Sequence, residues 1–160
     1  MNVMKHLVTL FAILFTFSFC TASCSKDEEK TTSQNNGSEN KNPSTTKMKI
    51  TIGTAVFTAT LHDNPSANAF KARFPLTLNM TELNNNEKYY DFSKSLPTNA
   101  SVGGDIKVGD LTLYGDNTLV LFYKSFNTSY SYTRLGYVDN PTGLAAALGT
   151  GNVVVKFENN

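Results

Sequence analysis

Residues 47–61 read K-M-K-I-T-I-G-T-A-V-F-T-A-T-L, and this stretch decides the fold class. From Met48 to Ile52, apolar residues alternate with Lys or Thr, and the alternation resumes from Ala55 to Leu61. Because successive side chains of a β-strand point to opposite faces, this spacing predicts two half-buried strands. The Gly53-Thr54 pair between them is typical of a turn. The stretch therefore predicts a β-hairpin with one buried face.

The remainder of residues 48–160 predicts more strands of the same kind and two short helices. Further strand candidates, each bounded by turn residues, are 74–81, 88–92, 110–114, 118–124, 132–138 and 153–157. The segments Asp63-Asn64-Pro65-Ser66 and Asp139-Asn140-Pro141-Thr142 predict helix starts, because Asn caps free amides and Pro suits the first helical position. The second helix is expected to end at Gly149 or Gly151. Together these elements predict a mainly β fold, a closed antiparallel β-barrel with two short capping helices.

One run of the sequence resembles a known family. The stretch from Gly104 to Tyr114, G-D-I-K-V-G-D-L-T-L-Y, is followed by Leu121-Phe122-Tyr123. It is similar to the glycine-punctuated run and the F-Y segment of the small bacterial cyclophilin-like domain family. The strand around Pro75 and the Leu135-Gly136 pair are also similar. The resemblance covers residues 48–160 and implies a cyclophilin-like β-barrel domain.

Charge and cysteine content exclude several classes of function. The chain has 160 residues, with 14 Lys and Arg against 13 Asp and Glu, and residues 48–160 hold nine of each sign. Nucleic-acid binding requires a basic surface, so this neutral domain predicts no nucleic-acid partner. Both cysteines, Cys20 and Cys24, precede the domain, which therefore has no disulfide and no thiolate zinc site. Asp105, Asp110 and Asp116 do not fit a calcium loop, and we expect neither a metal nor a cofactor.

The N-terminus predicts a lipoprotein signal peptide over residues 1–23. Residues 7–19 form a largely apolar run of 13 residues, shorter than the about 20 residues that a membrane span requires. Thr21-Ala22-Ser23 then precede Cys24, an arrangement that resembles the lipobox of bacterial lipoproteins. That resemblance implies that Cys24 is acylated, with palmitate among its acyl chains, and becomes the mature N-terminus. Several acyl chains give stable membrane attachment, and we expect attachment to the bacterial outer membrane.

Residues 24–47 predict a lipidated cysteine followed by a disordered tether. Residues 25–47 contain no aliphatic or aromatic side chain and cannot bury enough surface to fold. Asp27-Glu28-Glu29 resembles the acidic signal that sends some lipoproteins to the cell surface, although these charges could equally keep the tether solvated. The domain is therefore expected to be extracytoplasmic, either periplasmic or surface-exposed.

The domain offers few residues for catalysis. True cyclophilin prolyl isomerases carry the pattern F-H-R-x-x-x-x-F-x-x-Q-G-G, which has no counterpart here. Arg134 is the one candidate for the role of the isomerase arginine, and the alternative is a surface cation stacked on Tyr132. His62 is the only histidine of the domain, at the end of a strand, where a structural role is commoner. These features favour a non-catalytic module, with a weak prolyl isomerase or other enzyme using Arg134 as the alternative.

Aromatic residues provide the strongest candidate for a binding surface. All seven tyrosines lie in the domain, and residues 123–132, Y-K-S-F-N-T-S-Y-S-Y, alternate rings with small polar residues on an expected loop. Such a composition is typical of recognition surfaces, and the alternative is that the rings pack flat on the barrel. We predict a ligand groove that includes Tyr90, Tyr123, Tyr132 and Arg134.

The function predicted first is a binding or interaction module, held at the membrane by the lipid on Cys24. Its partner is expected to be a peptide, a glycan or a protein. A structural accessory lipoprotein of an envelope complex is a further alternative.

Overall fold

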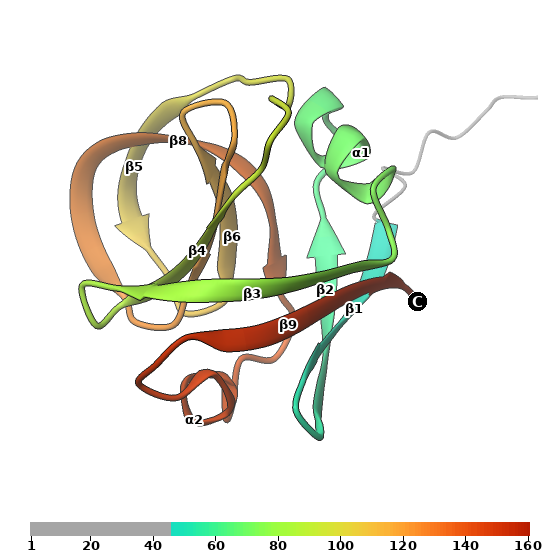
Figure 1. Cartoon of the computed structure of the whole chain (residues 1–160). Helices are drawn as coiled ribbons and strands as arrows, with labels where there is room; N and C mark the ends of the chain where they lie inside the picture. The colour runs from blue at the N-terminus through green and yellow to red at the C-terminus, as the bar shows by residue number, and fades with distance from the viewer. Residues whose placement is uncertain (1–45) are drawn as a thin grey trace, which may run out of the picture. The chain divides into compact units, whose positions relative to one another are not determined.

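The computed structural model describes residues 46–160, which form nine strands and two short helices (Figure 1). The strands are β1 (Thr46–Ile52), β2 (Ala55–Leu61), β3 (Leu76–Leu83), β4 (Glu87–Asp91), β5 (Ser101–Ile106), β6 (Asp110–Tyr114), β7 (Thr118–Phe122), β8 (Phe126–Val138) and β9 (Val153–Asn159). Within these residues, no helix has the length and apolar character needed to cross a membrane. The expected signal peptide and Cys24 lie outside the described residues, as does the tether up to residue 45.

Eight of the strands close into a ring. Neighbours follow the order β2, β1, β9, β3, β4, β7, β6 and β8, and β8 returns to pair with β2. All the pairings are antiparallel. The prediction of a mainly β fold with a closed antiparallel barrel is confirmed. The ninth strand, β5, pairs only with β8 and lies outside the ring.

The first hairpin forms as its alternation predicts. Met48, Ile50 and Ile52 on β1 and Phe57, Ala59 and Leu61 on β2 are buried, whereas the alternate residues Lys49, Thr51 and Thr58 are exposed or half-exposed. Gly53 occupies the turn with a positive φ of 56°, a conformation that glycine adopts without steric cost. β1 begins at Thr46, so the last two residues assigned to the tether belong to the hairpin.

The C-terminal strand β9 completes the barrel between two strands from the start of the domain. On one side it pairs with β1, where Phe157 lies opposite Ile50, and on the other with β3, where Phe157 lies opposite Leu76. Phe157 and Ile50 are completely buried. The ring thus closes only when the two ends of the domain meet.

The first helix, α1 (Pro65–Lys71), starts as predicted. Asn64 is the N-cap, its side-chain Oδ1 accepts from the amide of Ala67 at 2.8 Å, and Pro65 occupies the first position. Phe70 on its buried face packs edge-on against Phe157, with ring centroids 5.5 Å apart. The helix therefore packs onto the barrel core, beyond the end of β2 at the top of Figure 1.

The second helix, α2 (Leu144–Leu148), starts later than predicted. Its N-cap is Gly143, which makes no side-chain cap, and it ends at Gly149 as expected. The Asn140 side chain instead accepts from the amide of Thr142 in a local turn at 3.1 Å. Asparagine bonds its own backbone two residues on as readily as it caps a helix, and here the turn forms.

The largest difference from the sequence-based prediction is the length of β8. Residues 126–131, expected in a loop, are the first half of a 13-residue strand whose outer part pairs with β5, a strand that was not predicted. The two strands form an arm that curls at the left of Figure 1. A second apolar cluster, separate from the barrel core, joins this arm to the sheet through Ile106, Val120, Phe122 and Tyr132. Because Leu119 and Leu121 belong to the core, alternation places Val120 and Phe122 on the outer face of the sheet.

Candidate functional site: an aromatic cleft beside a buried carboxyl group

A cleft of about 540 Å³ lies between the β5–β8 arm and the outer face of β4, β6 and β7. Five aromatic residues line it, and we call it the aromatic cleft: Tyr89, Tyr114, Phe126, Tyr130 and Tyr132. Its polar lining comes from Glu87, Asp91, Thr118, Thr128, Asn127 and the β3–β4 turn residues Asn84 and Asn86. A volume of this size accommodates a small molecule or a few residues of a peptide.

The period of two along the strands places these side chains in the cleft. Glu87, Tyr89 and Asp91 are alternate residues of β4, and all three line the cleft. On β8 the same rule brings Tyr130 and Tyr132 to it. The intervening residues Lys88 and Tyr90 of β4 are not part of the lining, and of the intervening residues of β8 only Asn127, near its start, lines the cleft.

The tyrosine rings form an angled wall rather than a flat patch. Tyr114 meets Tyr130 edge-on at 6.2 Å between centroids, and it meets Tyr132 at 5.7 Å with 52° between the planes. Tyr130 is 64% exposed, so its ring is available to a ligand. Burial, together with the charge of Glu87 and the neighbouring tyrosines, raises the pKa of Tyr132 to about 12, and its hydroxyl is protonated at neutral pH.

Glu87 is the unusual member of the lining. The residue is only 8% exposed, and its carboxyl group makes no ion pair or hydrogen bond with any residue of the described range 46–160; its oxygens are not among the fully buried unpartnered atoms, so they keep contact with the solvent of the cleft. It lies opposite Phe122 in the β4–β7 pairing, in apolar surroundings. Burial, and secondly repulsion by Glu82, raises the pKa of Glu87.

Lys88, the next residue, does not neutralise Glu87, because the strand pleat turns it to the other side. Its side chain is completely buried and its Nζ donates to the carboxylate of Glu82 and to the carbonyl oxygens of Gly149 at 2.9 Å and Gly151 at 2.7 Å. Burial alone would raise the pKa of Glu82, but the hydrogen bonds from Lys88 and Tyr123 outweigh it and the pKa is lowered. All the donor capacity of this ammonium group is therefore used inside the protein.

The four predicted groove residues are not brought together. Tyr132 lines the aromatic cleft. Tyr123 is buried and its hydroxyl donates to Glu82 at 2.8 Å, an interaction that, with burial as the first cause, raises the pKa of Tyr123 to about 12. Tyr90 packs on the barrel core, with its ring 5.4 Å from that of Phe92.

Arg134 lies in a different place from the cleft. Its guanidinium pairs with Asp110 at 2.9 Å and donates to the carbonyl oxygen of Gly103 at 2.7 Å. It borders a smaller hollow of about 240 Å³ together with Asn64 and Thr133. The alternative expectation, that Arg134 stacks on Tyr132, is not seen: the cation–π contacts among the described residues are Arg73 over Phe92 and Lys88 over Tyr123.

Sequence reasoning missed Glu87, Tyr89 and Tyr114. The alternation of β4 could have indicated that Glu87 and Tyr89 share a face, but nothing local shows that the arm covers that face. His62, at the end of β2, is exposed, and its ring lies 5.8 Å from that of Tyr137. Among residues 46–160, no cluster of three or more His, Cys, Asp or Glu side chains could hold a metal ion.

The model of the cyclophilin-like family matches residues 50–158, which is most of the chain. The chain belongs to the cyclophilin-like family. The resemblance read from Gly104–Tyr114 is thereby confirmed.

A comparison with solved structures supports the fold of this cyclophilin-like domain. The solution structure of the hypothetical protein AF2241 from Archaeoglobus fulgidus superimposes with a TM-score of 0.56 at 15% identity, covering 72% of this chain and 95% of that one. At this identity the likeness shows a shared fold alone. A search of curated proteins finds no match.

Proposed function

We propose that the protein is a non-catalytic binding module of the cell envelope, whose cyclophilin-like domain binds its ligand in the aromatic cleft. The observation that supports this most is the combination of accessible tyrosine rings with a buried carboxyl group that the protein leaves unpaired. Tyrosines supply a large contact area at low entropic cost, and buried polar groups in a pocket supply orientation. A peptide or a glycan fits such a lining.

The lining favours recognition over catalysis. The residues around the cleft include neither a cysteine nor a histidine, and no lysine or arginine. Arg134, the candidate for isomerase chemistry, lies beside the other hollow with its guanidinium engaged by Asp110 and Gly103. Prolyl isomerisation through Arg134 would require these contacts to break, so binding is the proposal we adopt.

Binding can be tested with the full chain, solubilised in detergent, on glycan and peptide arrays. We expect the wild-type protein to retain a defined set of ligands and Tyr130→Ala to lose them. Tyr137→Ala is the matched control, because Tyr137 is also an exposed tyrosine of β8, at 42%, but lies outside the cleft lining. An array without any bound ligand, or binding that Tyr130→Ala leaves unchanged, would overturn the proposal.

We also propose that the domain is attached to the outer membrane by a lipid on Cys24. The apolar run of residues 7–19 and the small residues before Cys24 support this part. Metabolic labelling with palmitate should mark the wild-type protein and the Cys20→Ser control, and Cys24→Ser should remain unlabelled. Labelled Cys24→Ser, or unlabelled wild-type protein, would show the anchor to be wrong.

A further inference from the structure

We propose that the aromatic cleft recognises an alkylammonium group, with Glu87 as the counter-charge and the tyrosine rings as the wall around it. This inference rests on the proposed function, because it names the chemistry of the ligand for the same cleft.

The first support is the unpaired anion. Burying a carboxylate without a partner is unfavourable, and proteins normally place a cation or several donors against it. The Glu87 residue is more than nine-tenths buried, lines the cleft, and has no such partner among residues 46–160, and its carboxylate oxygens are not among the fully buried atoms, so they are reachable from the cleft. A cationic ligand would supply the missing partner.

The second support is a further acceptor in the same lining. The Oδ1 atom of Asn86 is buried and has no hydrogen-bond partner among the described residues, and Asn86 is adjacent to Glu87 in the β3–β4 turn. An alkylammonium group has donors and no acceptor, so it suits a place where a carboxylate and an amide oxygen without a partner come from adjacent residues. None of the lining residues carries a positive charge that would favour a phosphate or carboxylate ligand.

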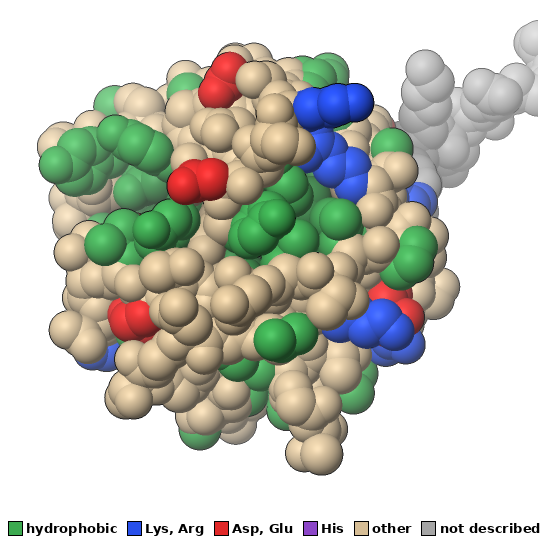
Figure 2. Space-filling view, in the orientation of Figure 1, with side chains coloured by type: hydrophobic (Ala, Val, Ile, Leu, Met, Phe, Trp, Pro, Cys, Tyr) green, Lys and Arg blue, Asp and Glu red, His purple; other side chains and the backbone are tan. Residues whose placement is uncertain are grey.

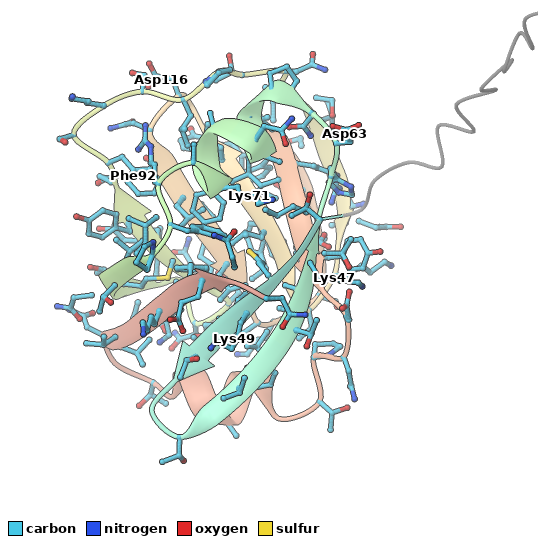
Figure 3. All side chains as sticks on the ribbon, turned by 90° about the vertical axis from the view of Figure 1, so that its right-hand side faces the viewer. Lys47, Lys49, Asp63, Lys71, Phe92 and Asp116 are labelled. Carbon is cyan, nitrogen blue, oxygen red and sulfur yellow. The ribbon has the colours of Figure 1, made fainter. Side chains whose placement is uncertain are left out.

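The third support is the distribution of charge. Asp91 also lines the cleft, and none of the lining residues is basic. Of the lysines of the domain, Lys88 points inward, and Lys47, Lys49 and Lys71 lie on the side of the barrel that faces the viewer in Figure 3. In Figure 2 most of the visible Lys and Arg side chains lie on the right, whereas the arm of β5 and β8 lies on the left in the same orientation.

The aromatic wall adds to this preference. The negative face of an aromatic ring attracts a cation within about 6 Å of its centroid, and several rings at different angles around one point strengthen the attraction. Tyr114, Tyr130 and Tyr132 present such a set of tilted rings. An aliphatic stem next to the ammonium group would pack against Tyr89 and Phe126.

The test measures amide chemical-shift changes by NMR in the full chain, in detergent, with N-acetyl-lysine methylamide as the probe. Its neutral counterpart, N-acetyl-norleucine methylamide, has the same backbone without the charge. We expect shifts on β4 and on the arm, and affinity for the lysine probe about tenfold above that for the norleucine probe. Equal affinity for the two probes would overturn the inference.

Variants distinguish the effect of the Glu87 charge on ligand affinity from an effect on folding. Glu87→Gln keeps the size of the side chain and removes its charge. It should lower the affinity for the lysine probe by about tenfold. Asp63→Asn, an exposed carboxylate on the side shown in Figure 3, is the control and should leave affinity unchanged. A melting temperature of Glu87→Gln at or above that of the wild type would show that the loss of affinity is not caused by unfolding, and retained affinity would contradict the role of Glu87.

Two further probes identify the source of the ammonium group. n-Butylammonium and spermidine carry the same chemistry without a peptide backbone. Tighter binding of the lysine probe than of both amines would indicate a peptide ligand, and the reverse would indicate a free amine. If methyl glucoside shifts the same amides in a Tyr130-dependent manner and no ammonium probe does, the inference of an alkylammonium ligand is wrong while the proposed binding function stands.

Discussion

Glu87 and Lys88 are adjacent in the sequence, but the pleat of β4 turns their side chains to opposite sides of the strand and so into different environments. Both are at least nine-tenths buried. Lys88 points toward the α2–β9 connection and meets a carboxylate and two carbonyl oxygens, whereas Glu87 points into the aromatic cleft and meets none. One buried charge therefore stabilises the fold, and the other is left for a ligand.

Replacing Glu87 with Gln should stabilise the free protein at neutral pH by at most about 1 kcal/mol, because the unpaired charge of a largely buried side chain is removed. The folded-state pKa of Glu87 is raised above the ordinary value of 4.5, so ionisation opposes folding above that value and no longer does so below it. The advantage of the variant should therefore shrink as pH falls from 7.5 to 4. Urea unfolding at both pH values measures it, and a variant less stable than wild type at pH 7.5 would contradict the assignment.

Replacing Lys88 with Met should destabilise the protein by about 3 to 5 kcal/mol, because Glu82 and two carbonyl oxygens lose their buried cation. Lys49→Met is the control, since the Lys49–Glu158 pair is at the surface and contributes little. Urea unfolding of both variants at pH 7.5 is the measurement. Similar midpoints in the two variants would show that Lys88 is not essential to the fold.

At the scale of elements, β8 shapes the cleft, because this one long strand pairs with three other strands along its length. It pairs with β5 in its first half, with β6 in its middle and with β2 at its end. Gly136 lies where β8 passes from β6 to β2, opposite Leu111 on one side and Leu61 on the other. A Cβ atom there would lie 2.3 Å from the carbonyl oxygen of Thr60, so only glycine allows β2 to approach.

Gly136→Ala should therefore destabilise the barrel by about 1 to 3 kcal/mol, because β2 and β8 must move apart. Gly151→Ala is a matched control, since a Cβ atom at Gly151 meets nothing within 4 Å and its φ lies outside the left-handed region. Thermal unfolding followed by circular dichroism gives the comparison. Equal melting temperatures for the two variants would show that β2 and β8 can move apart without a loss of stability.

For the whole domain, closure depends on β9, which lies between β1 and β3 although nearly a hundred residues separate it from β1. Phe157 is buried at this junction and also contacts Phe70 of α1. Hydrophobic burial must hold this junction together, because the domain has no cysteine for a disulfide.

Phe157→Ala should cost about 3 to 5 kcal/mol of stability, because the cavity lies where three elements meet. Val154→Ala on the same strand is the control, as Val154 is 54% exposed and its truncation should change little. Guanidinium unfolding of both variants tests the prediction. A loss in Phe157→Ala no larger than in Val154→Ala would mean that β9 is not needed to close the barrel.

Local patterns in the sequence determined the strands of the barrel, the cap of α1 at Asn64 and the fold class, because alternation and capping depend on neighbouring residues alone. Residues 126–131 were not predicted as a strand, since their rings and small polar groups suit a loop equally well and only pairing with β5 makes them extended. The same reason explains the groove prediction, in which Tyr132 reached the aromatic cleft while Tyr90 and Tyr123 turned to the core and Arg134 to another hollow.

Composition and local patterns were enough to predict that this chain has a neutral, disulfide-free β domain of cyclophilin-like type, and to predict which residues alternate along each strand of the barrel. That the arm of β8 lies over β4, and that Glu87 is buried beside Tyr89 of its own strand and beside tyrosines of two other strands, β6 and β8, follows from the tertiary structure alone. The physical reason is that side-chain direction is a local property of a strand, whereas burial and the absence of a partner depend on segments that meet from distant parts of the chain.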